Sequence, residues 1–208
     1  MSDLEQRLKH ALAARTPKRQ SAEGSRAAAV LIPVVGNPET SLIFTLRTET
    51  LRSHSGQISF PGGSLDPGES PVDAALRESC EEIGLDPSLV RMIGELDTFP
   101  TFVSGFTVTP FVGWLEEMPP LRPNPHEVAE VLVVPLARLT DDIRAEAGFE
   151  HGGRTYPTEA WVWDDHVIWG VTARVVRNFL EVLGEAGLVD PPGATSSWRL
   201  PPPAAARA

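Results

Sequence analysis

The chain has 208 residues, which is enough for one domain with a sizeable core. Its formal net charge of −10 disfavours a general nucleic-acid-binding role, because phosphate backbones require a positively charged surface. A single cysteine excludes an internal disulfide and fits a reducing compartment. No apolar run approaches the ~20 residues of a membrane span, and the N-terminus carries no signal-peptide core. We therefore expect a cytoplasmic protein without nucleic-acid or membrane partners.

The start of the chain predicts a helix followed by a polar linker. Ser2 and Glu5 have the spacing of a capping box, and apolar residues then recur at helical intervals up to about Arg15. Residues 16–25 are mostly polar and include a proline and a glycine. We therefore divide the chain into residues 1–25, a helix with a linker, and a main domain at residues 26–188.

Apolar and alternating runs predict six strands within the main domain. The first two flank the turn sequence Gly36-Asn37-Pro38 and should form a hairpin. Residues 165–183 predict a helix, because apolar side chains recur there every three or four positions. The proline- and alanine-rich end, residues 189–208, predicts a disordered tail. The strand ranges are 27–35, 41–46, 90–96, 107–115, 128–134 and 156–163.

Residues 63–85 predict a loop that leads into one amphipathic helix. Ser70 has the side chain of an N-cap, and Pro71 suits the first helical position, where no backbone donor is needed. Gly84 stands where a left-handed residue ends a helix. Cys80 lies within this helix, and we expect it to be a small buried residue rather than a nucleophile.

Three glutamates of this helix, Glu78, Glu81 and Glu82, are spaced i, i+3, i+4 and share one face. Their mutual repulsion costs a few tenths of a kcal/mol per pair, roughly, on an exposed helix. Arg77 lies four residues before Glu81, so a solvated surface with a salt bridge is one interpretation. A hard divalent cation such as Mg²⁺ or Mn²⁺, which prefers oxygen ligands, is the other. We predict that the three glutamates are metal ligands.

A second group of polar residues precedes this helix. Arg47 and Arg52 carry forked donors that suit phosphate oxygens, although an exposed arginine pair is often only part of a solvated loop. His54 offers a phosphate donor or an acid–base group, although a lone histidine is more often structural. The predicted substrate-binding residues are Arg47, Arg52, His54, Gln57, Gly62 and Gly63.

Two motifs in these segments resemble those of a known family. Residues 63–85 follow Gly-x5-Glu-x7-Arg-Glu-U-x-Glu-Glu-x-Gly-U, where U is a bulky apolar residue, except that Ser79 occupies the first U. The segment therefore resembles the Nudix hydrolases. The preceding sequence resembles Leu-Leu-Thr-x-Arg-Ser/Ala-x3-Arg-x3-Gly-x3-Phe-Pro-Gly-Gly, which marks the coenzyme A pyrophosphatase branch, with Ile43 and Phe44 for the leucines and Thr48 for the small residue. The matched positions are Gly63, Glu69, Arg77, Glu78, Glu81, Glu82, Gly84 and Leu85, and upstream Thr45, Arg47, Arg52, Gly56, Phe60, Pro61 and Gly62.

The resemblance implies an α/β fold, specifically a Nudix-type α/β/α sandwich with a mixed β-sheet. It also implies hydrolysis of a diphosphate with Mg²⁺ or Mn²⁺, which activate water and neutralise phosphate charge. Glu78 and Glu82 are the first metal ligands that it implies, and Glu81 completes the shell or holds a water. A backbone carbonyl from Gly62 or Gly63 is a further implied ligand.

The resemblance leaves the general base open between Glu81, Glu82 and Glu127. The last of these is the candidate for an acid that the family supplies from outside the motif, although a merely solvated loop glutamate explains it equally well. Arg77 and Glu69 are expected to form an ion pair that fixes the loop against the helix.

The implied substrate is coenzyme A or a derivative, cleaved to 3′,5′-ADP and 4′-phosphopantetheine or its acyl form. ADP-ribose, a dinucleotide or a nucleoside triphosphate is the alternative substrate. A non-catalytic binding protein of the same fold is disfavoured, because such proteins commonly lack motif glutamates that are all present here. Phe99, Phe102 and Phe106 either line a substrate groove or cover the end of the sheet. The oligomeric state stays open, with the N-terminal and C-terminal helices as surfaces that would support a homodimer.

Overall fold

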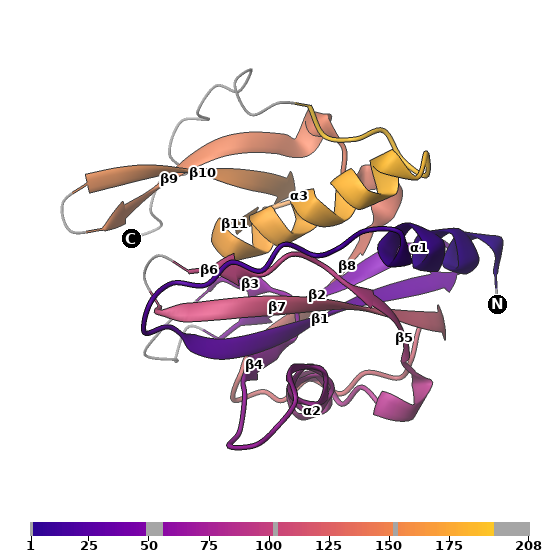
Figure 1. The fold of residues 1–208 in the computed structure, drawn as a ribbon, viewed down its shortest axis with the longest axis horizontal. Helices are drawn as coiled ribbons and strands as arrows, with labels where there is room; N and C mark the ends of the chain where they lie inside the picture. Colours follow the sequence, from indigo (N-terminus) through magenta and orange to yellow (C-terminus); the bar gives the residue numbers. More distant parts are fainter. Residues whose placement is uncertain (1, 49–55, 102–103, 152–153, 194–208) are drawn as a thin grey trace.

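Eight strands form one mixed β-sheet at the centre of the molecule (Figure 1). The computed structural model describes residues 2–48, 56–101, 104–151 and 154–193. In chain order the strands of this sheet are β1 (Arg26–Asn37), β2 (Ser41–Arg47), β3 (Ile58–Ser59), β4 (Gly62–Ser64), β5 (Arg91–Glu95), β6 (Phe99–Pro100), β7 (Phe106–Glu117) and β8 (Val128–Pro135). β1 pairs in parallel with β7 and antiparallel with β2 and β4. β3 and β8 extend the sheet from β2, while β5 and β6 pair with β7. The predicted β1–β2 hairpin is therefore confirmed.

Helices cover both faces of this sheet, which gives three layers (Figure 1). α2 (Pro71–Ile83) lies on one face, whereas α1 (Asp3–Ala13) and α3 (Gly170–Glu185) lie on the other. β1 contributes alternate residues to the two cores: Leu31 packs in the α2 core and Ile32 in the α1–α3 core. Burial on both faces explains the continuous apolar run of β1. The α/β/α sandwich with a mixed sheet is confirmed.

The N-terminal helix α1 is fastened to the sheet rather than standing apart from it. Ser2 accepts a hydrogen bond from the Glu5 backbone N–H at 3.1 Å, as an N-cap does. The buried Glu5 carboxylate accepts two hydrogen bonds from Arg91 of β5, at 2.8 and 3.0 Å, instead of returning to Ser2. Leu8 and Leu12 enter the same core as α3. Only the Ser2 half of the predicted capping box is thus present.

The bounds of α2 agree with the sequence prediction. Ser70 accepts a hydrogen bond from the Asp73 backbone N–H at 3.3 Å, and Pro71 opens the helix. Gly84 ends it with a left-handed φ of 65°. Among the described residues no helix, this one included, is both long and apolar enough to cross a membrane.

The prediction that Cys80 is buried was wrong, since its side chain is exposed. Ser79, the preceding residue, faces the sheet and is buried, and its hydroxyl donates to the Ala75 carbonyl at 2.6 Å. One step along a helix turns the side chain by about 100°, so Cys80 points away from the core.

The C-terminal prediction was wrong about where the last helix begins. β10 (Arg154–Trp163) turns through Asp164 and Asp165 into β11 (His166–Trp169), and only then does α3 begin at Gly170. Asp164 has a φ of 47°, which suits the tight turn of a hairpin. β9 (Arg144–His151), which was not predicted, completes this second, three-stranded sheet. Cross-strand pairing therefore outweighs the apparent helical period of residues 165–169.

Candidate active site

Arg77 joins the loop that precedes α2 to the acidic face of the helix. Its guanidinium donates to both Glu69 carboxylate oxygens, at 2.9 and 3.0 Å, and to the Ser64 carbonyl at 3.1 Å. It also donates to Glu78 and Glu81, at 3.0 and 3.1 Å. The hydrogen bonds from Arg77 lower the pKa of Glu69, and those from Glu69 raise the pKa of Arg77. The ion pair expected between Arg77 and Glu69 is therefore present, with both groups charged.

Glu82 is the most deeply buried of the three motif glutamates, at 2% exposure. Its carboxylate accepts a hydrogen bond from the Gly62 backbone N–H at 3.1 Å and lies 3.4 Å from the Arg47 guanidinium. Burial raises the pKa of Glu82 to about 7, although Gly62 and Arg47 oppose this shift. An ionised Glu82 is thus only partly compensated by its neighbours.

The glycines of β4 let the backbone approach the glutamates closely. A Cβ atom at Gly62, whose φ is 152°, would lie 2.3 Å from the Ala29 carbonyl oxygen. One at Gly63 would lie 2.5 Å from the Glu78 carboxylate carbon. Both predicted glycines therefore lie at the site: backbone atoms leave no room for a side chain at Gly62, and a side chain at Gly63 would displace the Glu78 carboxylate.

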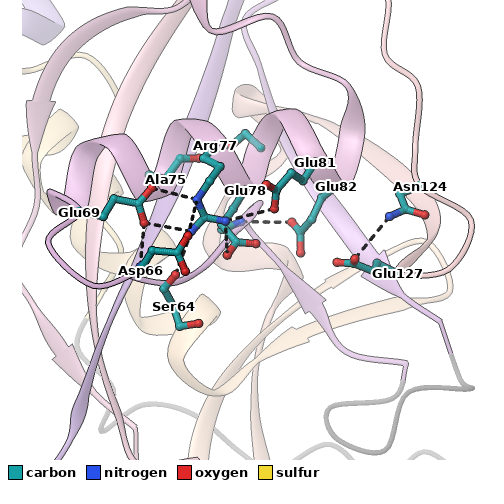
Figure 2. Close-up of polar contacts among 12 residues, drawn as sticks. Ser64, Asp66, Glu69, Ala75, Arg77, Glu78, Glu81, Glu82, Asn124 and Glu127 are labelled. Atoms are coloured by element: carbon teal, nitrogen blue, oxygen red, sulfur yellow. Dashed lines mark hydrogen bonds and ion pairs between the residues drawn. The ribbon is translucent and has the colours of Figure 1, made fainter.

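Glu78 and Glu81 differ in their surroundings although both bond to Arg77. Burial raises the pKa of Glu78, against the lowering effect of Arg77. The Glu81 side chain is 56% exposed and lies at the rim of the cluster. Figure 2 shows that both carboxylates project from the same side of α2 as Glu82. The convergence expected from their spacing is present, but Arg77 occupies the space beside Glu78 and Glu81.

Glu127 faces the helix from the loop before β8 (Figure 2). Its negative charge contributes, after burial, to the raised pKa of both Glu78 and Glu82. Its carboxylate accepts a hydrogen bond from the Asn124 side chain at 3.3 Å. Asn124 was not predicted as a site residue, because the Asn-Pro pair signals a turn but does not indicate which helix the turn contacts.

The structure describes only part of the predicted substrate-binding segment. Arg47 ends β2 beside Glu82, and its buried Nε atom has no hydrogen-bond partner among the described residues. The Arg47 backbone N–H donates to the Gln57 carbonyl at 3.0 Å, so Gln57 lies next to this arginine. Arg52 and His54 lie outside the described residues, as does Phe102. Arg47, Gly62 and Gly63 are thus the members placed directly against the glutamates.

The donor set of this cluster suits a divalent cation. Among the residues that the structure describes, no three acidic, histidine or cysteine side chains already enclose a metal-sized position. Glu78 and Glu82 nevertheless have raised pKa values because they are buried near other carboxylates. A cation with carboxylate ligands would offset that repulsion, and hard ions such as Mg²⁺ or Mn²⁺ prefer such oxygens. Glu78 and Glu82 fit this role, with Glu81 at the rim and Glu127 facing them from the loop before β8.

Comparisons with known proteins identify the family of this chain. The NUDIX domain model matches residues 25–156. The chain is 36% identical over 167 residues to an uncharacterized Nudix hydrolase, NudL, of Photorhabdus laumondii, covering 79% of this chain and 88% of that protein. Identity to Escherichia coli K12 NudL, also uncharacterized, is 37% over 171 residues, covering 76% and 83% respectively. A MutT/nudix family protein from Enterococcus faecalis has the same fold, with a TM-score of 0.53 at 13% identity over 89% of this chain and 75% of that one. This chain therefore belongs to the Nudix hydrolases, a family that generally uses divalent metal ions.

Proposed function

We propose that this Nudix hydrolase cleaves the diphosphate of coenzyme A or its derivatives, giving 3′,5′-ADP and 4′-phosphopantetheine or its acyl form. One observation carries the proposal: the two sequence motifs meet in space. Arg47, from the segment that resembles the coenzyme A pyrophosphatase motif, lies 3.4 Å from the carboxylate of Glu82 on the metal-binding helix. A phosphate contact at Arg47 would thus lie beside the metal.

The metal ligands that we propose are Glu78 and Glu82, with Glu81 as a further ligand or a contact to a bound water. Mg²⁺ or Mn²⁺ held there would neutralise the diphosphate oxygens and lower the pKa of a bound water. Arg77 positions this set, because its hydrogen bonds fix the directions of the Glu78 and Glu81 carboxylates.

Among the three candidates for the general base, we propose Glu127. Glu81 is exposed and hydrogen-bonded to Arg77. Both oxygens of Glu82 are engaged, one by Gly62 and the other by Arg47. The bond from Asn124 uses one oxygen of Glu127 and leaves the other for the proton of an attacking water.

Arg47 is the side chain that we propose to grip the diphosphate. Its buried, unpartnered Nε among the described residues is a donor that a phosphate oxygen would satisfy. Arg52, His54 and Gln57 are proposed to extend the same contact. A cytoplasmic location fits this proposal, since the chain has one cysteine and its substrate would be an intracellular cofactor.

The test is product analysis after incubation with coenzyme A and either Mg²⁺ or Mn²⁺. We expect equal amounts of 3′,5′-ADP and 4′-phosphopantetheine, and no products in the presence of a chelator. Hydrolysis of ADP-ribose, a dinucleotide or a nucleoside triphosphate without any cleavage of coenzyme A would keep the metal site and reject the substrate. A lack of turnover of every diphosphate would favour a binding protein instead.

Arg47→Ala sharpens this test. Because Arg47 contacts the substrate in our proposal, the substitution should raise KM about tenfold and lower kcat less. Steady-state kinetics on coenzyme A measure both values. An unchanged KM would remove Arg47 from the binding site.

A further inference from the structure

Glu127 stands on a turn, so its position depends on what holds that turn. Asn124 closes it through two acceptors. Its backbone carbonyl accepts from the N–H groups of Glu127 and Val128, at 3.0 and 2.8 Å. Its side-chain Oδ1 accepts from the His126 N–H at 3.1 Å, as in an Asx turn. The side chain and the backbone of one residue thus build the turn that carries Glu127.

The same contact orients the Asn124 amide. Since Oδ1 faces the His126 N–H, the Nδ2 group faces the other way, toward Glu127. Nδ2 donates to Glu127 Oε1 at 3.3 Å (Figure 2). The amide therefore holds one oxygen of the carboxylate and determines where the second oxygen points.

Asn124 also connects this turn to the metal-binding helix. Its backbone N–H donates to the Glu82 carbonyl at 2.8 Å, and the Arg122 N–H donates to the Ile83 carbonyl at 2.7 Å. These carbonyls belong to the last turn of α2, where no intrahelical partner is available. A Cβ atom at Gly84 would come within 3.0 Å of Arg122, so the glycine permits the close approach. One residue therefore links the backbone of Glu82 to the carboxylate of Glu127.

The turn further holds the strand end that carries Arg47. The Thr48 backbone N–H donates to the Glu127 carbonyl at 3.0 Å, and the Thr48 hydroxyl donates to the His126 carbonyl at 3.2 Å. Thr48 directly follows Arg47 in the chain. The turn at residues 124–127 thus connects α2, the Glu127 carboxylate and the end of β2 that carries Arg47.

We propose that Asn124 is a positioning residue for hydrolysis: it fixes the Glu127 carboxylate opposite the α2 glutamates without contacting metal or substrate itself. This inference rests on the proposed function only in that Glu127 takes part in the chemistry. It does not depend on which diphosphate is cleaved.

The test uses Asn124→Asp, which is nearly isosteric. Aspartate keeps the acceptor for the His126 N–H and so preserves the turn, but it places a second carboxylate oxygen where Nδ2 faced Glu127. We expect kcat to fall about 30-fold, with KM within twofold, on whichever diphosphate the wild-type protein hydrolyses. The far-UV circular dichroism spectrum of the metal-free variant should match that of the wild type, because the turn is preserved. His126→Ala is the matched control in the same turn and should keep wild-type kinetics, since its side chain is exposed and makes no hydrogen bond to the part of the chain that the structure describes.

A double-mutant cycle decides whether Asn124 acts through Glu127. In a Glu127→Gln background, Asn124→Asp should lower kcat by less than about threefold further. An equal fold decrease in kcat from Asn124→Asp in both backgrounds would overturn the inference about Asn124 but would leave the role of Glu127 intact. Wild-type activity of Glu127→Gln would instead overturn the role of Glu127, and the inference with it.

A measurement on the metal-free protein checks the contact without any turnover. The Asn124 side-chain NH₂ pair in a ¹H–¹⁵N spectrum is identified as the pair lost in Asn124→Asp. It should shift in Glu127→Gln, because the acceptor changes from a carboxylate to an amide oxygen. An unchanged pair would show that Asn124 does not hold Glu127.

Discussion

The two ends of the charged face of α2 are built differently. Toward its N-terminus, Arg77 hydrogen-bonds Glu69 through two oxygens and reaches the Ser64 carbonyl, so charges and donors are matched. Toward its C-terminus, Glu82 is buried with one backbone N–H and one guanidinium 3.4 Å away. The pKa of Glu82 is accordingly raised to about 7, whereas that of Glu69 is lowered. The N-terminal end, where Arg77 matches the charges, fixes the directions of the carboxylates. The C-terminal end, with the uncompensated charge of Glu82, is where a cation would bind.

The largest expected effect comes from removing the charge at the buried end. Glu82→Gln keeps the shape of the side chain and an acceptor for the Gly62 N–H, but lacks the negative charge that a metal requires. We expect kcat to fall on the order of 10³-fold at saturating Mg²⁺, the scale of losing one electrostatic contact to the reacting phosphate. Single-turnover kinetics measure this, and circular dichroism confirms the fold. Activity near that of the wild type would exclude Glu82 as a ligand.

The same carboxylate should make the metal-free protein less stable as pH rises. The pKa of Glu82 is about 7 in the folded protein, against an ordinary value of 4.5. Between these pH values the folded state therefore binds more protons than the unfolded state. The stabilising contribution of Glu82 is complete below about pH 4.5 and is lost as pH rises through about 7. The difference between the two pKa values corresponds to about 3–4 kcal/mol.

Urea unfolding at pH 5 and pH 8 in a chelating buffer compares wild type with Glu82→Gln. Between pH 5 and pH 8 we expect the free energy of unfolding to fall more in the wild type than in the variant, because the variant has no carboxylate to ionise at this position. Equal pH dependence in the two proteins would contradict the raised pKa. Mn²⁺ should restore stability at pH 8 in the wild type alone, because a ligand of the folded state stabilises it.

At the matched end, Arg77→Lys tests geometry rather than charge. Lysine keeps the positive charge but cannot donate to both Glu69 oxygens in the planar fork of a guanidinium. We expect kcat to fall about tenfold with little change in KM, since Glu78 and Glu81 lose their fixed directions. A loss as large as that of Glu82→Gln would mean that Arg77 acts in the chemistry itself, and the contrast between the two ends would fail.

The sequence predicted the local parts of this site and named Arg47 and Glu127, but it did not predict the contacts that join the distant segments. The caps of α2 depend on Ser70 and Gly84, which lie in the same segment as the helix, so short-range chemistry was sufficient. The Asn124 contact to Glu82 joins segments that are distant in the chain, and no spacing rule encodes it. The extent of burial of Glu82 likewise follows from packing against β4, not from its place in the motif.

The errors in the fold have a similar origin. Residues 165–169 continue the apolar period of α3, yet the Asp164–Asp165 turn and the pairing with β10 make them a strand. β9 has few strand-forming residues and is a strand because β10 provides hydrogen-bond partners for it. In both places tertiary pairing decided between local alternatives that a single sequence leaves nearly balanced.

The smallest effect is expected on the opposite face of the same helix. Cys80 is adjacent to Glu81, but its side chain is exposed and directed away from the core. Cys80→Ala should change the free energy of unfolding by less than about 0.5 kcal/mol, because no buried contact is lost and alanine favours a helix. Its kcat should remain within twofold of the wild-type value. Urea unfolding and steady-state kinetics measure both quantities. A substantial loss of activity would mean that substrate or metal also contacts this face of the helix. The difference between the two ends of the charged face would then not be enough to explain where α2 acts.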